Sequence, residues 1–535
     1  MNFDERRPTA RRTSSPRSIS RTARRRPARA AAVVVAGALL LAGCTAAPKE
    51  QSPVGSTTGP AARQAPEGFE QYYGQALEWK DCEDGLECAT ASAPVSWQDA
   101  ESGSIELALV RDPADGRDPE GSLLVNPGGP GASGVDFVRG DATGPEPIFG
   151  KKLHDAFDIV GFDPRGVETS TPVTCFDDAR KDESLAKSFD TSTDEGIEAM
   201  AAEARAWGEA CAQNTGDVLG HVDTQSAARD LDMLRAVLGD DQLHYLGFSY
   251  GTQLGATYAG LFPDRAGRLV LDGAIDTTLS ADDISKGQAV GFENALRAYV
   301  ADCQAGAGCP LRGTVDDGMR QIRALLDSAL ERPIPTSDDA RPVTQTLAFY
   351  GIAVTLYNQA SWPALTQALD EAINQGTGDT LLYLADTYND RNADGSFSTN
   401  SSEAFRAVGC LDDRGTSDVD EMRAEAADIE KQAPTVGTFF SYGGTSCTDW
   451  PAPVAEKEYD VHAKGAPPIV VVGTTNDPAT PYVWAEGLAK TLDSGVLVTY
   501  EGEGHTAYSP SRECVADVVE SYLVDGDVPQ EGTTC

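Results

Sequence analysis

The stretch that decides the fold is Gly247-Phe248-Ser249-Tyr250-Gly251, a G-x-S-x-G sequence between two regular segments. The largely apolar residues 242–246 before it predict a strand, and residues 252–262 after it predict a helix that Pro263 ends. A strand-to-helix turn this sharp strains the backbone of its central residue and lifts that side chain clear of the sheet. The pattern therefore predicts that Ser249 is a nucleophile, with a simple tight turn as the alternative.

A glycine-rich loop follows a second apolar strand. Residues 122–125 predict that strand, which runs into Asn126-Pro127-Gly128-Gly129-Pro130-Gly131-Ala132-Ser133-Gly134. The backbone N–H groups of such a loop can approach a ligand closely. Where a G-x-S-x-G serine attacks a carbonyl, one N–H from such a loop and one from the residue after the serine hold the developing negative charge. We expect these donors to be Gly129 and Tyr250, with Gly128 as the alternative to Gly129.

Two further residues, whose side chains can act as an acid or a base, come directly after predicted strands. Asp477 follows the apolar run at 468–473, and His505 follows the strand expected at 495–500. Catalytic groups gather beyond the carboxyl ends of parallel strands. A serine needs a base, and the base needs an orienting acid, so we predict His505 as the base and Asp477 as its partner. The order Ser, Asp, His is that of the α/β-hydrolases; Asp272 and Asp276 are the competing acids.

The order of these segments predicts an α/β-hydrolase fold with a helical lid inserted in the core. Residues 69–275 would form the first part of the core, and residues 456–535 would complete it. Between them, residues 276–455 show mostly helical patterns and no strong buried-strand run, so we expect the lid there. The clearest of these helical stretches are 287–303, 316–330 and 349–374.

The first 44 residues are typical of a bacterial lipoprotein signal peptide. Arginines precede an apolar run at 30–41, which is too short for an ordinary transmembrane helix, and Leu41-Ala42-Gly43-Cys44 resembles the lipobox. We expect Cys44 to carry the lipid and residues 45–68, rich in Ala, Pro, Gly, Ser and Thr, to be a flexible linker. The alternative is an ordinary secretory signal with an unrelated cysteine. The protein is thus expected to be exported, either anchored to the outside of the cell membrane or secreted.

The cysteine count also indicates an exported protein. Apart from Cys44 the chain has ten cysteines, an even number that predicts five disulfides. Short spacings suggest two of the pairs and sequential order suggests the other three, although sequence alone does not fix the pairing. These pairs are Cys82–Cys88, Cys303–Cys309, Cys175–Cys211, Cys410–Cys447 and Cys514–Cys535. No C-x-x-C or Cys/His cluster indicates zinc, and we expect no metal and no cofactor.

The charge balance excludes one class of partner. The chain has 83 acidic and 43 basic residues and a formal net charge of −40. Such a surface repels nucleic acid and anionic membranes. We therefore expect no nucleic-acid partner, and contact with a membrane only through the lipid anchor.

The loop at 126–131, the Ser249 turn, Asp477-Pro478-Ala479-Thr480-Pro481 and the Gly502–His505 tail together resemble the secreted tripeptidyl aminopeptidases of actinobacteria, relatives of the prolyl iminopeptidases. The resemblance covers about residues 79–535 and implies a metal-free serine exopeptidase that removes short peptides, tripeptides first, from free N-termini. Mycobacterial cell-envelope serine hydrolases of the same family carry lipid anchors and act as proteases or esterases. Gly166-Val167-Glu168-Thr169 departs from the family pattern.

An aminopeptidase also needs an acid to bind the ammonium group of its peptide substrate. The candidates are Asp276, Asp412 and Asp413, and Asp412 follows Cys410, which a disulfide would hold in place. A cell-envelope esterase or lipase, or an endopeptidase, would use the same triad. A binding lipoprotein without catalysis is the third possibility, and the complete set of triad residues argues against it.

Overall fold

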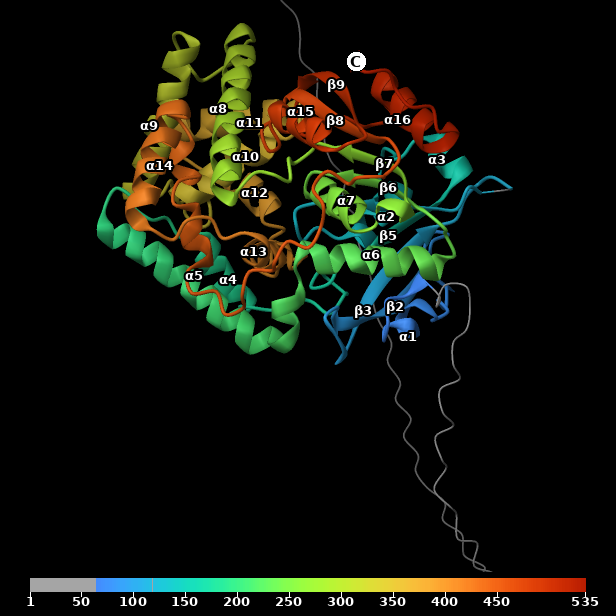
Figure 1. Cartoon of the computed structure of the whole chain (residues 1–535). Coiled ribbons are helices and arrows are strands. Elements are labelled where there is room, and N and C mark those ends of the chain that lie inside the picture. The colour runs from blue at the N-terminus through green and yellow to red at the C-terminus, as the bar shows by residue number, and fades with distance from the viewer. Residues whose placement is uncertain (1–63, 118) are drawn as a thin grey trace, which may run out of the picture. The chain divides into compact units, whose positions relative to one another are not determined.

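The computed structural model describes residues 64–117 and 119–535, and its centre is a ten-stranded sheet in the order β1-β2-β3-β5-β4-β6-β7-β8-β9-β10 (Figure 1). The expected signal peptide, Cys44 and most of the expected linker lie outside the described residues. The strands are β1 (Lys80–Asp81), β2 (Glu87–Ser96), β3 (Asp99–Asp112), β4 (Ser122–Asn126), β5 (Asp158–Phe162), β6 (Leu243–Phe248), β7 (Ala266–Asp272), β8 (Ile469–Asn476), β9 (Gly495–Glu503) and β10 (Thr533–Thr534).

The strands from β5 to β9 are parallel, with β4 between β5 and β6, so their carboxyl ends meet at one edge of the sheet. The β1–β2–β3 ribbon joins β5 in antiparallel fashion. This order, with β5 and β4 exchanged relative to the chain, gives the α/β-hydrolase fold that the sequence predicts. Its consequence is that the residues after β4, β6, β8 and β9 gather in one place.

Alternate residues of the central strands enter two different cores. Leu124 and Tyr245 belong to the core on one face, and Leu123 and Leu246 belong to the core on the other, as the two-residue period of a strand requires. Helices pack on both faces, which explains why the middle parts of these strands are largely apolar. The first face is covered mainly by α1 (Glu70–Tyr73), α5 (Asp194–Thr215), α6 (Thr224–Leu238), α7 (Tyr250–Leu261) and α15 (Tyr482–Thr491), and the second by α2 (Gly134–Thr143), α3 (Lys151–Ala156) and α16 (Glu513–Asp525).

The chain between β7 and β8, residues 273–468, forms a helical insertion with a hydrophobic core of its own. No strand interrupts it, and Figure 1 shows its helices from yellow-green to orange. The α-helices are α8 (Ala281–Ala305), α9 (Val315–Glu331), α10 (Gln345–Leu356), α11 (Trp362–Asp370), α12 (Asp379–Tyr388), α13 (Ser401–Asp412) and α14 (Val419–Gln432). In addition, α4 (Asp178–Leu185) lies before α5 in the chain and forms an ion pair with α13 through Lys181.

The helical stretch expected at 349–374 is divided. The helix α10 ends at Leu356, a short 3-10 turn covers Gln359–Ser361, and α11 begins at Trp362. Pro363 lies in the first turn of α11, where proline's missing N–H is not needed. The break matters for the site because Tyr357 lies just after the end of α10, outside both helices.

Five disulfides join the described cysteines, and they are the pairs that spacing and order suggested, with S–S distances from 1.98 to 2.08 Å. Disulfides persist in oxidising compartments, so this set fits an exported protein. Within the described part of the chain, no helix combines the length and the apolar character that a membrane crossing requires.

Candidate active site

Ser249 lies at a strained turn between β6 and α7. Its φ is 55°, in the left-handed region, and it is the residue immediately before the first turn of α7. The turn needs its glycines, because a Cβ on Gly247 would lie 2.5 Å from the carbonyl oxygen of Gly251, and one on Gly251 would lie 2.7 Å from that of Asn126. The side chain of Ser249 is half-buried and not part of the hydrophobic core. This is the local geometry that the G-x-S-x-G pattern predicts.

His505 and Asp477 meet at the same edge of the sheet. Nδ1 of His505 lies 2.9 Å from both carboxylate oxygens of Asp477. The carboxylate also accepts hydrogen bonds from the backbone N–H groups of Ala479, Thr480 and Thr506, at 2.9, 2.8 and 3.1 Å. These donors fix the position of the Asp477 carboxylate, so that it can orient the imidazole.

The negative charges at this edge of the sheet make the imidazole of His505 more basic. Burial disfavours the imidazolium and lowers the pKa of His505, but the carboxylates of Asp477 and Asp272 outweigh burial, and the net pKa lies above the ordinary 6.5. A nearby Ser hydroxyl could therefore pass its proton to this ring more readily than to a free histidine.

Asp272, the last residue of β7, links the serine turn to the histidine loop. Its backbone oxygen accepts from the N–H of Ser249 at 2.9 Å, and its carboxylate accepts from the N–H groups of Ala507 and Tyr508 at 2.7 to 3.0 Å. Burial raises the pKa of Asp272 to about 6, although these N–H groups favour the ionised form. Asp272 therefore positions both neighbours, whereas Asp477 is the acid bonded to the imidazole.

The loop after β4 approaches the serine from the other side. A Cβ on Gly128 would lie 2.9 Å from the Cβ of Ser249 and 3.0 Å from the N atom of Tyr250, so only glycine fits there. The N–H of Gly128 is engaged, since it donates to Oδ1 of Asn126 at 3.0 Å. For the N–H groups of Gly129 and Tyr250, we find no acceptor among the described residues. Both are free to bind an oxyanion, which favours Gly129 over Gly128.

Comparison with known proteins identifies the family of this chain. Residues 433–535 match the model of the TAP-like α/β-hydrolase family. The serine protease Hip1 of Mycobacterium tuberculosis is 36% identical over 530 residues, which cover 94% of this chain and 96% of that protein. The chain belongs to the TAP-like family of α/β-hydrolase serine peptidases.

Other relatives carry different names. Carboxylesterase B of Mycobacterium tuberculosis is 36% identical over 499 residues, covering 90% of this chain and 94% of the relative. Tripeptidyl aminopeptidase of Streptomyces coelicolor is 27% identical over 484 residues, covering 86% of each chain. The TAP-like fold therefore includes proteins named as peptidases and as an esterase.

Of the three acids considered for a substrate ammonium, Asp412 is the one with a hydrogen bond to α7 among the described residues. It accepts from the N–H of Thr224 at 2.9 Å and from the Thr224 hydroxyl at 2.5 Å, and Nε2 of Gln253 on α7 lies 3.4 Å away. The same hydroxyl lies 2.6 Å from the hydroxyl of Tyr250. Burial raises the pKa of Asp412 to about 7, and the Thr224 bonds only partly oppose this shift.

The other two acids bind groups of the protein itself. Asp276 accepts from the N–H and hydroxyl of Thr278, two residues further along the chain. Asp413 accepts from the N–H of Ala281 at the start of α8, and from that of Gly415. Both carboxylates stabilise local turns or a helix terminus, and neither has a bond to the serine turn.

Two residues at this TAP-like site were not expected from the sequence. The hydroxyl of Thr480 lies 3.2 Å from Nδ1 of His505, and the carbonyl of Tyr357 accepts from the N–H of His505 at 2.9 Å. The ring of Tyr357 also packs edge-on against the imidazole, with centroids 5.4 Å apart. Thr480 could have been found from its spacing of three residues after Asp477, but nothing near Tyr357 in the chain connects it to the site.

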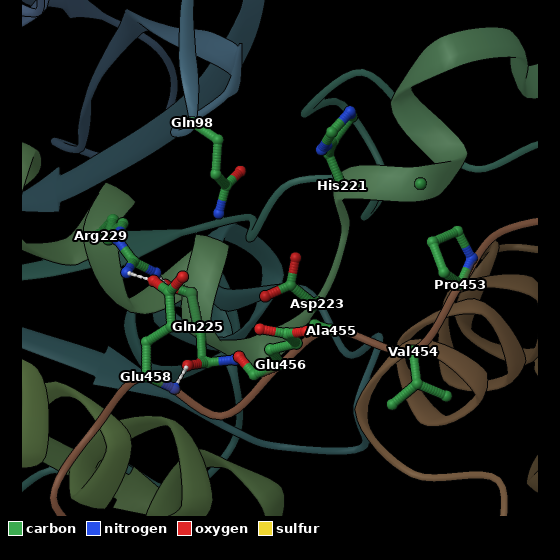
Figure 2. A pocket seen from close by; sticks show the side chains of 11 residues that line it. Gln98, His221, Asp223, Gln225, Arg229, Pro453, Val454, Ala455, Glu456 and Glu458 are labelled. Carbon is green, nitrogen blue, oxygen red and sulfur yellow. Dashed lines mark hydrogen bonds and ion pairs between the residues drawn. The ribbon is translucent and has the colours of Figure 1, made fainter.

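A separate cavity of about 170 Å³ lies beside the start of α6 (Figure 2). Several of its polar groups are already paired, since Arg229 forms an ion pair with Glu458 and Asp223 caps α6 through Ser226. Gln225 bonds the backbone of Glu456 and Glu458. Ser249, Asp477 and His505 do not line this cavity, so it is a junction between α6 and the chain that enters β8, separate from the candidate active site.

One group of potential metal ligands occurs among residues 64–117 and 119–535, formed by Asp112, Asp141 and His154. The two ring nitrogens of His154 lie 3.2 Å from Asp112 and 3.1 Å from Asp141. These bonds raise the pKa of His154 to about 10, so both nitrogens carry protons at neutral pH. The group is an imidazolium between two carboxylates, far better suited to hold α3 against the sheet than to ligate a cation.

Proposed function

We propose that this TAP-like peptidase is an exopeptidase that releases short peptides, tripeptides first, from free N-termini. Ser249, His505 and Asp477 would form its triad. The observation that carries the proposal is the contact of His505 with Asp477 at the sheet edge where Ser249 stands on its strained turn. Asp272 supports it, because its backbone oxygen accepts from the N–H of Ser249 and its carboxylate accepts from the loop after His505.

The proposed reaction has two halves. Ser249 attacks the scissile carbonyl while His505 takes the hydroxyl proton, and Asp477 stabilises the imidazolium that forms. The N–H groups of Gly129 and Tyr250 bind the oxyanion. His505 then gives its proton to the leaving amine, water attacks the acyl-enzyme by the reverse route, and the short peptide leaves.

We further propose that Asp412 binds the substrate ammonium. A carboxylate oxygen can accept more than one hydrogen bond, so the bonds from Thr224 leave capacity for a cation. The raised pKa of Asp412 reflects a carboxylate that lacks a positive partner, and an ammonium would supply one. The helical insertion would close the site beyond this acid and limit the length of peptide released.

We also propose that the mature protein is anchored to the outer side of the cell membrane by a lipid on Cys44. The disulfides support export, and the lipobox-like Leu41–Cys44 supports the anchor. Metabolic labelling with a fatty-acid analogue should mark the wild type and not Cys44→Ser. Release of unlabelled wild-type protein into the medium would favour simple secretion.

The resemblance to carboxylesterase B keeps an esterase as the second candidate. Acyl transfer to Ser249 would be the same for an ester, so the substrate alone distinguishes the two. Purified enzyme should therefore be assayed with di-, tri- and tetrapeptide anilides, their N-acetylated forms and nitrophenyl esters of several chain lengths. The exopeptidase should prefer the free tripeptide; equal turnover of free and acetylated peptides would contradict it, and turnover of esters alone would establish the esterase.

A further inference from the structure

The helix α13 of the insertion touches both sides of the candidate active site. At its first turn, a Cβ on Gly131 of the glycine-rich loop would lie 2.7 Å from the carbonyl of Ser401 and 3.2 Å from the N atom of Phe405. At its last residue, Asp412 bonds Thr224, whose hydroxyl lies beside that of Tyr250. The helix therefore runs from the loop of one oxyanion donor to the helix of the other, a distance of about 16 Å for its length.

The contacts of α13 with the core make it a fixed wall. The N–H groups of Glu168 and Asn400 each donate to the other residue's side chain, at 2.9 and 2.6 Å. Lys181 of α4 forms an ion pair with Glu403 at 2.7 Å, and both side chains are almost fully buried. Glu168 lies in the stretch Gly166-Val167-Glu168-Thr169, where the sequence departs from the family pattern, and here it takes part in anchoring α13.

One face of this wall is left open. Phe405, Gly409 and Asp412 follow one another at spacings of four and three residues and so share a face of the helix. Phe405 is 57% exposed, a large fraction for an aromatic side chain. The opposite face is buried in the core. Its residues are Ala404, Ala407, Val408, Cys410 and Leu411.

Gly409 has no structural reason to be glycine. A Cβ at this position would meet no atom within 4 Å, and its φ is not in the left-handed region that favours glycine. Glycine inside a helix weakens the helix relative to alanine. The missing side chain therefore leaves space on the open face, between Phe405 and the acid that we propose for the ammonium.

We propose that this open face is the subsite for the N-terminal residues of the peptide, with Gly409 giving room for the chain and Phe405 contacting an apolar side chain. The inference rests on the proposed function and names the residues that would select its substrate. The rise from Phe405 to Asp412 is about 10 Å, and three extended residues also span about 10 Å. The reacting carbonyl would lie toward Phe405 and the glycine-rich loop, with the ammonium at Asp412.

The first test compares Gly409→Leu and Gly409→Ala with wild type. The ratio of kcat/KM for a free tripeptide anilide to that for nitrophenyl acetate should fall at least tenfold in Gly409→Leu, because leucine fills the space. Gly409→Ala should change the ratio less and should raise the Tm, since alanine favours the helix. An unchanged ratio in a folded Gly409→Leu protein would overturn the subsite.

The second test uses Phe405→Ala, with Tyr383→Ala as its control. Tyr383 is 69% exposed on the neighbouring helix α12, so its removal should leave the peptide preference within twofold of wild type. Phe405→Ala should lower kcat/KM for tripeptides with bulky apolar residues at least tenfold more than for trialanine anilide. Equal losses on both peptides would overturn the role of Phe405.

Failure of the proposed function would look different. An esterase would not turn over the wild-type peptides at all, whereas failure of the subsite leaves peptide turnover intact in the variants. Nitrophenyl octanoate tests whether the open face binds an acyl chain instead of a peptide. A loss of octanoate turnover without a loss of peptide turnover in Gly409→Leu would show that the open face binds an acyl chain, and would overturn the peptide as its occupant.

Discussion

The carboxyl edge of the sheet and the open face of α13 lie on the same candidate site but are built in opposite ways. At the sheet edge, Asp477 accepts bonds from His505 and three backbone N–H groups, and Asp272 accepts from two more. On α13, a Cβ added to Gly409 would meet no atom within 4 Å, and Phe405 is largely exposed. The core therefore holds the candidate catalytic side chains in place with hydrogen bonds. The insertion instead leaves unfilled space that a substrate can occupy.

The largest effect should come from breaking the sheet edge. His505→Ala and Asp477→Asn should each lower kcat by about 10⁴, on peptides and esters alike, and the double variant should be little worse because the triad acts as a unit. Steady-state kinetics on both substrate classes measures this. Asp272→Asn is the matched control: it should lower the Tm through the loss of bonds to Ala507 and Tyr508, with a smaller loss of kcat. If Asp272→Asn were the inactive variant, the assignment of the acid would be wrong.

A smaller and more selective effect should come from the insertion. Acetylating the tripeptide removes its charge and adds bulk at the closed end, so kcat/KM should fall at least about a hundredfold, on the order of 3 kcal/mol. Asp412→Asn keeps the shape of the side chain and should abolish most of the preference for the free over the acetylated tripeptide. Its kcat/KM for nitrophenyl acetate should change much less. Asp413→Asn, whose carboxylate serves the α8 terminus, should retain it. Loss of discrimination in Asp413→Asn alone would transfer the role to that residue.

The two regions should also respond differently to pH. The pKa of Asp412 is raised to about 7, so the carboxyl is mainly neutral below that pH and ionised above it. Ammonium binding needs the ionised form, and the ratio of free to acetylated kcat/KM should therefore rise severalfold between pH 6 and pH 8. The acetylated peptide should follow only His505, whose raised pKa causes activity to fall on the acid side. A ratio that is independent of pH, or that persists as a rise in Asp412→Asn, would contradict this account.

The smallest effect should come from the disulfide Cys410–Cys447, which joins α13 to the chain 37 residues later. Replacing both cysteines by serine should lower the Tm by several degrees, since the closed loop restrains the unfolded chain. It should also reduce the tripeptide-to-ester ratio by a few fold, because Cys410 lies between Gly409 and Asp412. The matched change at Cys82 and Cys88, on the β1–β2 ribbon, should leave that ratio unchanged. Equal effects on the ratio would show that α13 has no special part in selection.

Most of the sheet edge could be predicted from the sequence because its signals are local. The apolar runs before Asn126, Ser249, Asp477 and His505 correspond to β4, β6, β8 and β9, and strand ends in a parallel sheet must converge. The strained conformation of Ser249 follows from its flanking glycines in the same way. The pairs of cysteines, too, followed from spacing and order.

The insertion could be predicted only as a set of helices. Which helix reaches the site depends on contacts between residues far apart in the chain, such as Glu168 with Asn400, and Asp412 with Thr224. No periodicity in one segment records such contacts. Three acids were therefore candidates for the ammonium, with only the disulfide at Cys410 to favour Asp412, and Tyr357 and the open face of α13 were not expected at all.

The central claim is that Ser249 is the nucleophile and His505 its base, and labelling with a fluorophosphonate tests it most directly. Mass spectrometry of the digested, labelled wild type should find the adduct on Ser249 and on no other serine, at a rate that falls by orders of magnitude in His505→Ala. Ser249→Ala should take no label and keep the wild-type Tm, since its side chain belongs to no hydrophobic cluster. An adduct on another serine, or undiminished labelling in His505→Ala, would contradict the account.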